Sequence, residues 1–341
     1  MIDISQNQIM KDWNVDNSNE PLVSIRCITY NHESYISQAL DGFLMQKTKF
    51  PFEVIVHDDA STDKTAEIIR EYEAKYPKII KPIYEVENQW SKHDGSLARI
   101  MKNACKGKYI AVCEGDDYWI DDNKLQLQVE FLENNNEYGL CYTKSHIYNQ
   151  LASEMTGTMG LGKTTFNEIF FSYDIPTATM VYRKSLFDKY DDFKNQNGKK
   201  WIVGDYPLSL WFSLNSKIKF FPVITSVYRV LEKSASHFKS FSDEEKFKFN
   251  VYEYIQLFFI ETFVKDPEEK EKMIILINDE INRYLCRVAL SSKLYEKYKC
   301  YAKKIKSKRS KDLIIKIISS NKIFFESSFL IYNLKQKRLC R

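Results

Sequence analysis

The most informative stretch of this chain is residues 109–119, YIAVCEGDDYW. Its first five residues are apolar and predict a buried strand. Glu114, Asp116 and Asp117 follow at the carboxyl end of that strand, where three carboxylates repel one another unless a cation neutralises them. Ligands bind at the carboxyl ends of strands in open α/β sheets. The stretch therefore predicts a divalent cation that holds a phosphorylated ligand; the alternative interpretation is a solvated acidic turn.

Strand-like and helix-like patterns alternate from residue 21 to residue 148. The predicted strands cover residues 22–29, 52–56, 77–84 and 109–113, and the predicted helices cover residues 33–46, 62–76, 96–104 and 123–134. This alternation is typical of an α/β fold with a mostly parallel central sheet and helices on both of its faces.

The pattern changes after residue 138. Residues 139–148 and 177–182 predict strands, and the glycines within residues 155–166 predict a flexible loop. Residues 206–214 predict a short helix, and residues 218–228 predict extended chain that is broken by Pro222. After residue 242 the chain is predicted to be helical to its end.

Polar side chains also end the first two predicted strands. The first ends in TYNH, residues 29–32, and the second in HDDASTD, residues 57–63. Parallel strands bring both ends to the edge that carries the acidic turn. A carboxylate there can accept hydrogen bonds from a nucleobase or a ribose hydroxyl, and helix N-termini offer backbone N–H groups to phosphate.

With these motifs in place, the chain resembles the family 2 glycosyltransferases, which have the GT-A fold. Residues 23–31 resemble the first strand of that family, residues 56–63 its nucleotide-binding signature, and residues 114–119 with 124–125 its metal-binding DXD motif. The resemblance covers residues 21–137 and extends more weakly to residue 237. It implies a catalytic domain over 21–240 with a nucleotide-binding half (21–137) and an acceptor-side half (138–240). A helical, basic extension over 241–341 would follow. Residues 1–20 are polar and rich in Asn and Asp, and we expect them to form a flexible leader.

The resemblance also implies roles for single residues. The nucleotide and the donor sugar would be held by Thr29, Tyr30, Asn31, Asp58, Asp59 and Asp116. Asp117 would ligate Mn²⁺ or Mg²⁺, and His237 would meet the diphosphate or the metal. Glu114 stands where the family usually has Asp, so we do not expect it to be a direct ligand.

Transfer of a sugar needs a stabilised leaving group and a base for the incoming hydroxyl. In the family the base is an acidic residue just before a helix, and Asp205 in residues 204–208, GDYPL, matches that context. Asp205 is therefore predicted to be the general base of an inverting hexosyltransferase. Its alternative role is that of a helix N-cap.

The end of the chain is strongly basic. Residues 299–341 hold thirteen Lys or Arg against two acidic residues, a net charge of +11, whereas the whole chain has +4. Apolar residues interleave with these charges, which predicts contact of residues 293–341 with the anionic inner leaflet of a membrane. The alternative is a solvated helix packed on the catalytic domain. No motif for nucleic acid accompanies the charge, so we expect no nucleic-acid partner.

Composition indicates the compartment. No run of about 18 apolar residues predicts a membrane span, and the polar N-terminus lacks a signal-peptide core. The seven scattered cysteines indicate reduced thiols, and together these features predict a cytoplasmic protein.

The family implies a nucleotide-sugar donor and a glycan or lipid-linked glycan as acceptor. Two other functions stay open at this point. A sugar nucleotidyltransferase would need a glycine-rich loop with Lys or Arg near the first strand, and residues 29–37 contain neither. A degenerate, transferase-like binding or scaffold module is the other alternative, and it would not need the intact set of acidic residues at the strand ends.

Overall fold

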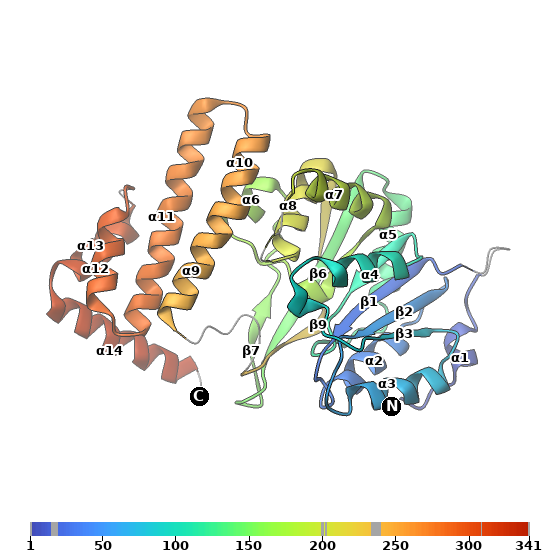
Figure 1. Ribbon diagram of the computed structural model, residues 1–341. Helices are drawn as coiled ribbons and strands as arrows, with labels where there is room; N and C mark the ends of the chain where they lie inside the picture. Colours follow the sequence, from blue (N-terminus) through green and yellow to red (C-terminus); the bar gives the residue numbers. More distant parts are fainter. Residues whose placement is uncertain are drawn as a thin grey trace. The chain divides into compact units, whose positions relative to one another are not determined.

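The structure is a computed structural model that describes residues 2–14, 20–198, 201, 203–232, 240–307 and 309–339. The chain divides into two compact units (Figure 1). The first holds residues 1–200 and 208–232, and the second holds residues 201–207 and 233–341. Helix α8 (Asp205–Asn215) crosses the boundary between them.

Nine strands of the described chain form one sheet in the first unit, in the order β3-β2-β1-β4-β8-β6-β9-β5 with β7 paired to β6. Its first four strands are parallel neighbours, as the alternating pattern predicts. They are β3 (Ile80–Tyr84), β2 (Phe52–Asp58), β1 (Val23–Thr29) and β4 (Tyr109–Val112). Every residue of β2 and β4 is buried, because helices cover both faces of a parallel sheet.

Three helices connect these strands, a fourth follows β5, and all four carry the predicted apolar faces. They are α2 (Ile36–Leu44), α3 (Thr65–Lys75), α4 (Ser96–Ala104) and α5 (Lys124–Asn134). Figure 1 shows α2 and α3 along one side of the parallel strands and α4 along the other. The core between sheet and helices includes Ile25, Val54, Leu40 and Phe43, all fully buried. This packing holds the carboxyl ends of β2, β1 and β4 side by side.

The rest of the sheet is mixed. Strand β8 (Val181–Arg183) runs antiparallel to β4 and to β6 (Tyr138–Asn149), and β9 (Lys217–Val230) runs parallel to β6 and antiparallel to β5 (Tyr118–Trp119). Pro222 does not break β9 as expected; the register with β6 shifts beside it, so no ladder hydrogen bond is required of its nitrogen. Residues 154–159, which fall largely within the expected loop, form β7 (Glu154–Met159), a hairpin partner of β6.

Shorter helices complete the first unit. These are α6 (Phe166–Phe171), α7 (Lys184–Gln196) and the 3₁₀ turns Trp90–Lys92 and Thr177–Thr179. The N-terminal segment, expected to be a flexible leader, contains α1 (Gln6–Met10) and contacts the domain. Ile9 is buried, and Trp13 Nε1 donates to Thr48 Oγ1 at 3.0 Å. The contacts of Ile9 and Trp13 hold this otherwise polar segment against the domain.

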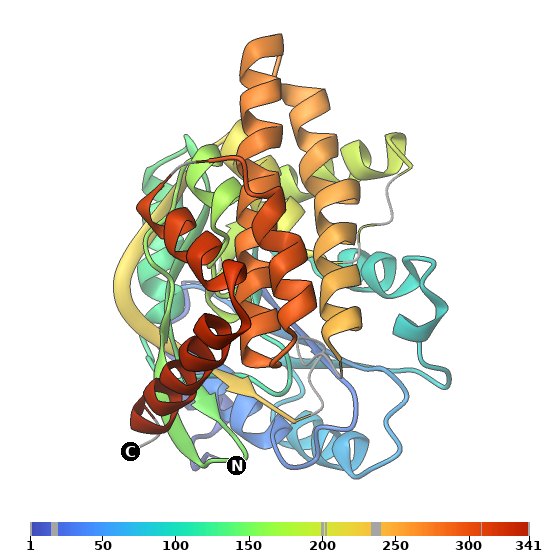
Figure 2. The same cartoon turned by 90° about the vertical axis from the view of Figure 1, so that its left-hand side faces the viewer.

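The second unit is helical, as predicted, and Figure 2 shows its helices coloured orange to red. They are α9 (Phe241–Val251), a π-helical turn (Tyr252–Gln256), α10 (Leu257–Phe263), α11 (Pro267–Ser291), α12 (Tyr295–Lys304), α13 (Ser310–Ser320) and α14 (Lys322–Leu339). A buried ion pair joins α11 to α13: Arg283 Nε donates to Asp312 Oδ1 at 2.6 Å. This pair lowers the pKa of Asp312 to about 2. No helix of the described residues has the length and hydropathy that a bilayer span requires.

Candidate functional site

The ends of β1, β2 and β4 meet at one edge of the sheet. The backbone N–H of Asp59, just past β2, donates to the carbonyl oxygen of Thr29 at 3.0 Å. On the other side of β1, the N–H of Gly115 donates to the carbonyl oxygen of Ile28 at 2.9 Å. The structure therefore places the acidic turn and the strand-two signature on either side of Thr29, within one hydrogen-bonded edge.

Gly115 is required by the closeness of this contact. A Cβ atom at that position would lie 2.6 Å from Thr29 Oγ1 and 2.7 Å from Thr29 Cβ, closer than side chains approach one another. The turn can therefore lie against the end of β1 only because residue 115 has no side chain.

The first two loops are tied together by side chains. Asn31 has a positive φ of 54°, and its backbone N–H donates to Ser61 Oγ at 2.8 Å. Its Oδ1 accepts from the backbone N–H of Thr62 at 2.8 Å. The neighbouring Tyr30 is 44% exposed. Asn31 thus shapes the edge by its own contacts, whereas Tyr30 presents a ring to solvent.

Asp58, the last residue of β2, and Asp59, which follows it, differ in their surroundings. Both oxygens of Asp59 accept backbone N–H groups, from Gln89 at 2.6 Å and from Trp90 at 3.0 Å. Asp59 therefore fixes the loop before α4. Asp58 is also buried, but its Oδ1 has no hydrogen-bond partner among the described residues. Burial raises the pKa of Asp58, and hydrogen bonds from Ser61 partly oppose this.

Asp117 is the buried member of the acidic turn, with 4% of its surface exposed, and Asp116 is half-buried. Burial raises the pKa of Asp117 well above its usual range, and the negative charge of Asp116 raises it further. A cation that binds beside this carboxylate stabilises its ionised form, so cation binding at this position is favourable.

Arg229, near the end of β9, is a central residue that the sequence did not single out. Its backbone N–H donates to Asp117 Oδ1 and its Nε donates to the carbonyl oxygen of Asp116, both at 2.8 Å. Its two terminal nitrogens donate to Gln150 Oε1 and Gln38 Oε1, both at 2.7 Å. The available signal was an arginine at the end of a long extended run, TSVYR, residues 225–229.

Several buried polar atoms at this edge have no partner among the described residues. They include Thr29 Oγ1, His32 Nδ1 and Asp58 Oδ1. Burial lowers the pKa of His32, which favours its neutral ring, although Asp116 and Asp63 oppose the shift. Buried polar atoms are normally hydrogen-bonded, so this concentration marks an edge with unused binding capacity.

The acidic residues of this edge do not form a closed metal site among the described residues. Within the described residues, no group of three or more His, Cys, Asp or Glu side chains could hold an ion by itself. Mg²⁺ and Mn²⁺ that act on phosphates need fewer protein ligands. One or two carboxylates are enough, because water and the phosphate oxygens complete the coordination shell. Asp117, with a pKa raised by burial and by Asp116, fits a metal of this open kind.

The remaining two predicted residues do not belong to the first unit. Asp205 is the first residue of α8, in the second unit, and its Oδ1 accepts from the N–H of Tyr206 at 2.8 Å. Its position at a helix start agrees with either of its predicted roles. His237 lies outside the described residues.

Lys124, which follows the acidic turn in the sequence, is a fully buried lysine. Lys124 Nζ donates to Gln128 Oε1 at 2.5 Å and to the carbonyl oxygen of Thr179 at 3.2 Å. It also lies 4.5 Å from the ring centroid of Trp119, which is itself buried in the core. No carboxylate of the described chain pairs with this lysine, so burial lowers its pKa to about 8.

This lysine gives a pH prediction. Its pKa is lower in the folded chain than in the unfolded chain, so the fold penalises its charged form. As the pH rises from about 8 to about 10.5, the wild type should therefore gain up to about 3 kcal/mol relative to Lys124→Met. Urea unfolding of both proteins at the two pH values measures this difference, in which the other titrating groups cancel. An equal pH response in the two proteins would contradict it.

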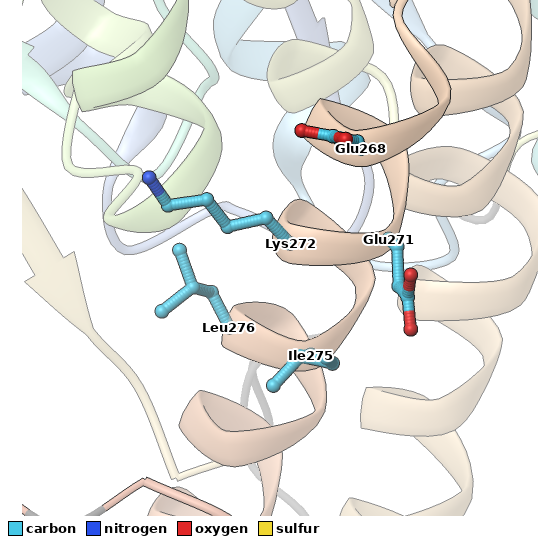
Figure 3. Close-up of a pocket in the computed structure, with 5 residues that line it drawn as sticks. All are labelled: Glu268, Glu271, Lys272, Ile275 and Leu276. Atoms are coloured by element: carbon cyan, nitrogen blue, oxygen red, sulfur yellow. The ribbon is translucent and has the colours of Figure 1, made fainter.

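A depression on α11 offers no comparable chemistry. It encloses about 300 Å³ and is lined by Glu268, Glu271, Lys272, Ile275 and Leu276 (Figure 3). All five side chains come from one helix. We therefore regard it as an ordinary solvated helix surface, and the sheet edge as the candidate site.

Comparison with known proteins gives the family of the chain. The model of a family described as Glycosyl transferase family 2 matches residues 24–191. An uncharacterized protein of Mycobacterium tuberculosis is 36% identical over 230 residues, which are 66% of this chain and 63% of that relative. An uncharacterized glycosyltransferase of Methanocaldococcus jannaschii is 31% identical over 210 residues, 58% of this chain and 70% of the relative. The chain thus spans less than two thirds of the mycobacterial relative.

Solved structures confirm the fold. S. aureus TarS 1–349 in complex with UDP-GlcNAc has a TM-score of 0.57 and 18% identity, covering 83% of this chain and 81% of that chain. The mannosyltransferase PcManGT from Pyrobaculum calidifontis, in complex with GDP-Man and Mn²⁺, has a TM-score of 0.50 and 15% identity, covering 93% and 90%. The chain therefore has the GT-A fold, with its C-terminal helices, that the resemblance implied.

Proposed function

Because this chain belongs to glycosyltransferase family 2, we propose that it transfers a sugar from a nucleoside-diphosphate sugar to a hydroxyl of a glycan or a lipid-linked glycan. The observation that carries the proposal is the sheet edge. There the ends of three parallel strands bring two acidic loops to either side of Thr29. The two solved structures of similar fold were determined with UDP-GlcNAc and with GDP-Man, and we take UDP-sugars as the first donors to test.

The nucleoside would lie against the ends of β1 and β2. Asp58 has the unpartnered oxygen, so it is the better candidate for direct contact with the base or the ribose. Asp59 would act through the loop whose amides it binds. Thr29 and Asn31 would line the same surface, with the exposed ring of Tyr30 beside them.

A divalent cation would be held by Asp117, with Asp116 beside the donor sugar. When bound, Mn²⁺ or Mg²⁺ supplies charge that stabilises the departing diphosphate. Asp117 would contribute the oxygen that does not accept the Arg229 amide. His237 remains the predicted further contact to the metal or the diphosphate.

Asp205 would accept the proton of the acceptor hydroxyl. An unperturbed hydroxyl is a poor nucleophile at neutral pH, so a positioned carboxylate is needed as the hydroxyl oxygen attacks the anomeric carbon. Direct attack on the face opposite the diphosphate inverts the anomeric configuration.

A screen of nucleotide sugars tests this function. The wild-type protein is incubated with UDP- and GDP-sugars, in Mn²⁺ or in excess EDTA, and released nucleoside diphosphate is measured. We expect release from one donor in Mn²⁺ and little in EDTA. Binding without turnover would favour the scaffold module, and release of nucleoside triphosphate with pyrophosphate present would favour the nucleotidyltransferase.

The last two helices support a membrane contact. Seven large apolar side chains are exposed there: Leu313, Ile314, Ile317, Ile323, Phe324, Leu330 and Ile331. Exposed cationic side chains lie on the same part of the chain: Lys303, Lys304, Lys306, Arg309, Lys311 and Lys322. Apolar groups beside cations fit the interface of an anionic lipid surface, so we propose peripheral attachment at the cytoplasmic face of the membrane.

Substitution of both Ile323 and Phe324 by Ser should weaken this contact by about ten-fold or more, since each side chain loses apolar area that lipid would cover. Co-sedimentation of the full chain with phosphatidylglycerol-containing vesicles measures it. Leu151→Ser is the control: Leu151 is an apolar residue of the first unit, more exposed than Ile323 or Phe324, and the variant should bind like the wild type. Equal binding of all three proteins would refute the contact.

A further inference from the structure

We propose that Arg229 is the positioning residue of the acidic turn: it fixes residues 116 and 117 in the geometry that receives the metal and the diphosphate, without contacting the diphosphate itself. The inference rests on the proposed function for the identity of the ligand. Its structural part concerns only the turn and can be tested separately.

The hydrogen bonds of Arg229 join four segments of the first unit. Two of them hold the turn, one through the carbonyl oxygen of Asp116 and one through the carboxylate of Asp117. The other two reach Gln38 on α2 and Gln150, just past β6. The turn is thereby tied to β9, to α2 and to the β6–β7 hairpin at once, which removes the freedom that two adjacent carboxylates would otherwise have.

The surroundings of the guanidinium group argue against direct phosphate binding. Arg229 is only 6% exposed, and its guanidinium carbon lies 4.8 Å from the ring centroid of Tyr35, 5.1 Å from that of Tyr118 and 5.7 Å from that of Tyr148. To turn toward a phosphate, it would have to give up three hydrogen bonds and three cation–π contacts. An arginine that binds phosphate directly needs guanidinium nitrogens that are available to the ligand, whereas all three nitrogens of Arg229 are already engaged within the protein.

One oxygen of Asp117 is oriented by this arrangement. Oδ1 accepts the backbone N–H of Arg229, and no other hydrogen bond to this carboxylate is found within the described residues. Oδ2 is therefore the atom available to a cation. Groups that orient a metal ligand in this way typically change metal affinity or activity by about 10- to 100-fold when they are lost.

Arg229→Lys separates geometry from charge. Lysine keeps the positive charge but has a single ammonium group, which cannot serve Asp116, Gln150 and Gln38 together. If Arg229 acts only by its charge, the lysine variant should behave like the wild type. If it acts by position, Arg229→Lys should fail, and Gln150→Ala, which keeps the arginine but removes one anchor, should fail in part.

The first measurement needs no ligand. Hydrogen–deuterium exchange of the full chain should show the amides of residues 114–119 exchanging at least about ten-fold faster in Arg229→Lys, with the sheet strands unchanged. Lys217→Met, at the exposed opposite end of β9, is the matched control and should leave the turn protected. Unchanged exchange in Arg229→Lys would overturn the inference.

The second measurement uses UDP and Mn²⁺ in calorimetric titrations, with GDP in parallel. In Arg229→Lys we expect the Mn²⁺-dependent gain in UDP affinity to fall about ten-fold or more, and the weak affinity in EDTA to change less than two-fold. An equal loss in Mn²⁺ and in EDTA would indicate direct phosphate contact and overturn the inference. A wild type that shows no Mn²⁺ effect with either nucleotide would contradict the metal part of the proposed function, and the exchange measurement would still decide the role of Arg229.

Discussion

Asp117→Asn should abolish metal-dependent donor binding and reduce sugar transfer by about three orders of magnitude. The amide keeps the oxygen that accepts the Arg229 N–H but removes the negative charge that a divalent cation requires. Loss of charge stabilisation at a reacting centre commonly costs 10²- to 10³-fold or more in rate. Released nucleoside diphosphate measures transfer, and calorimetry in Mn²⁺ measures binding.

The same substitution should not reduce the stability of the fold. Asp117 is buried with its pKa raised by burial and by Asp116, so its ionised form is unfavourable without a cation. The melting temperature of Asp117→Asn without metal is expected to equal or exceed that of the wild type. Asp122→Asn is the control, because Asp122 pairs with the exposed Lys47 and lies outside the site. Retained turnover in Asp117→Asn would remove this residue from the site.

Asp205→Asn should keep nucleotide binding and reduce kcat by about 10²- to 10⁴-fold, the usual contribution of a general base. Asn caps helix starts about as well as Asp, so the start of α8 should remain intact.

A control distinguishes this base from an ordinary helix cap. Asp266 caps the N-terminus of α11, and its side chain accepts from the N–H groups of Glu268 and Glu269. Asp266→Asn repeats the chemical change at another helix start of the same unit and should leave kcat unaltered. If Asp205→Asn turns over as fast as the wild type, Asp205 is a cap and the base lies elsewhere.

Local patterns were enough to predict the parallel half of the sheet. The apolar run before Glu114 and the acidic loop after Val56 each lie within a few residues, and β-α alternation places their ends at one edge. The prediction that these loops share one edge of the sheet depends only on the parallel direction of the strands, which the alternation favours. The fold class and the meeting of these strand ends at one edge therefore followed from short-range information.

Contacts between distant residues were not predictable in this way. Arg229 meets Asp116 from 113 positions away and Gln38 from 191, and nothing near Arg229 in the sequence indicates either partner. The different roles of Asp58 and Asp59 depend on Gln89 and Trp90, whose amides reach only one of the two. Strand β7 was missed because the glycines at 157, 160 and 162 indicated a loop, whereas pairing with β6 provides the backbone hydrogen bonds of the strand.

A hydrogen-exchange footprint of the wild-type chain with UDP and Mn²⁺, repeated with the nucleotide that the donor screen selects, tests the shared site at the sheet edge most directly. We expect new protection in residues 29–32, 58–63 and 114–118 together, and loss of that protection in EDTA. Protection confined to another surface, such as the α11 depression, or in only one of the three segments, would contradict a shared site at the sheet edge.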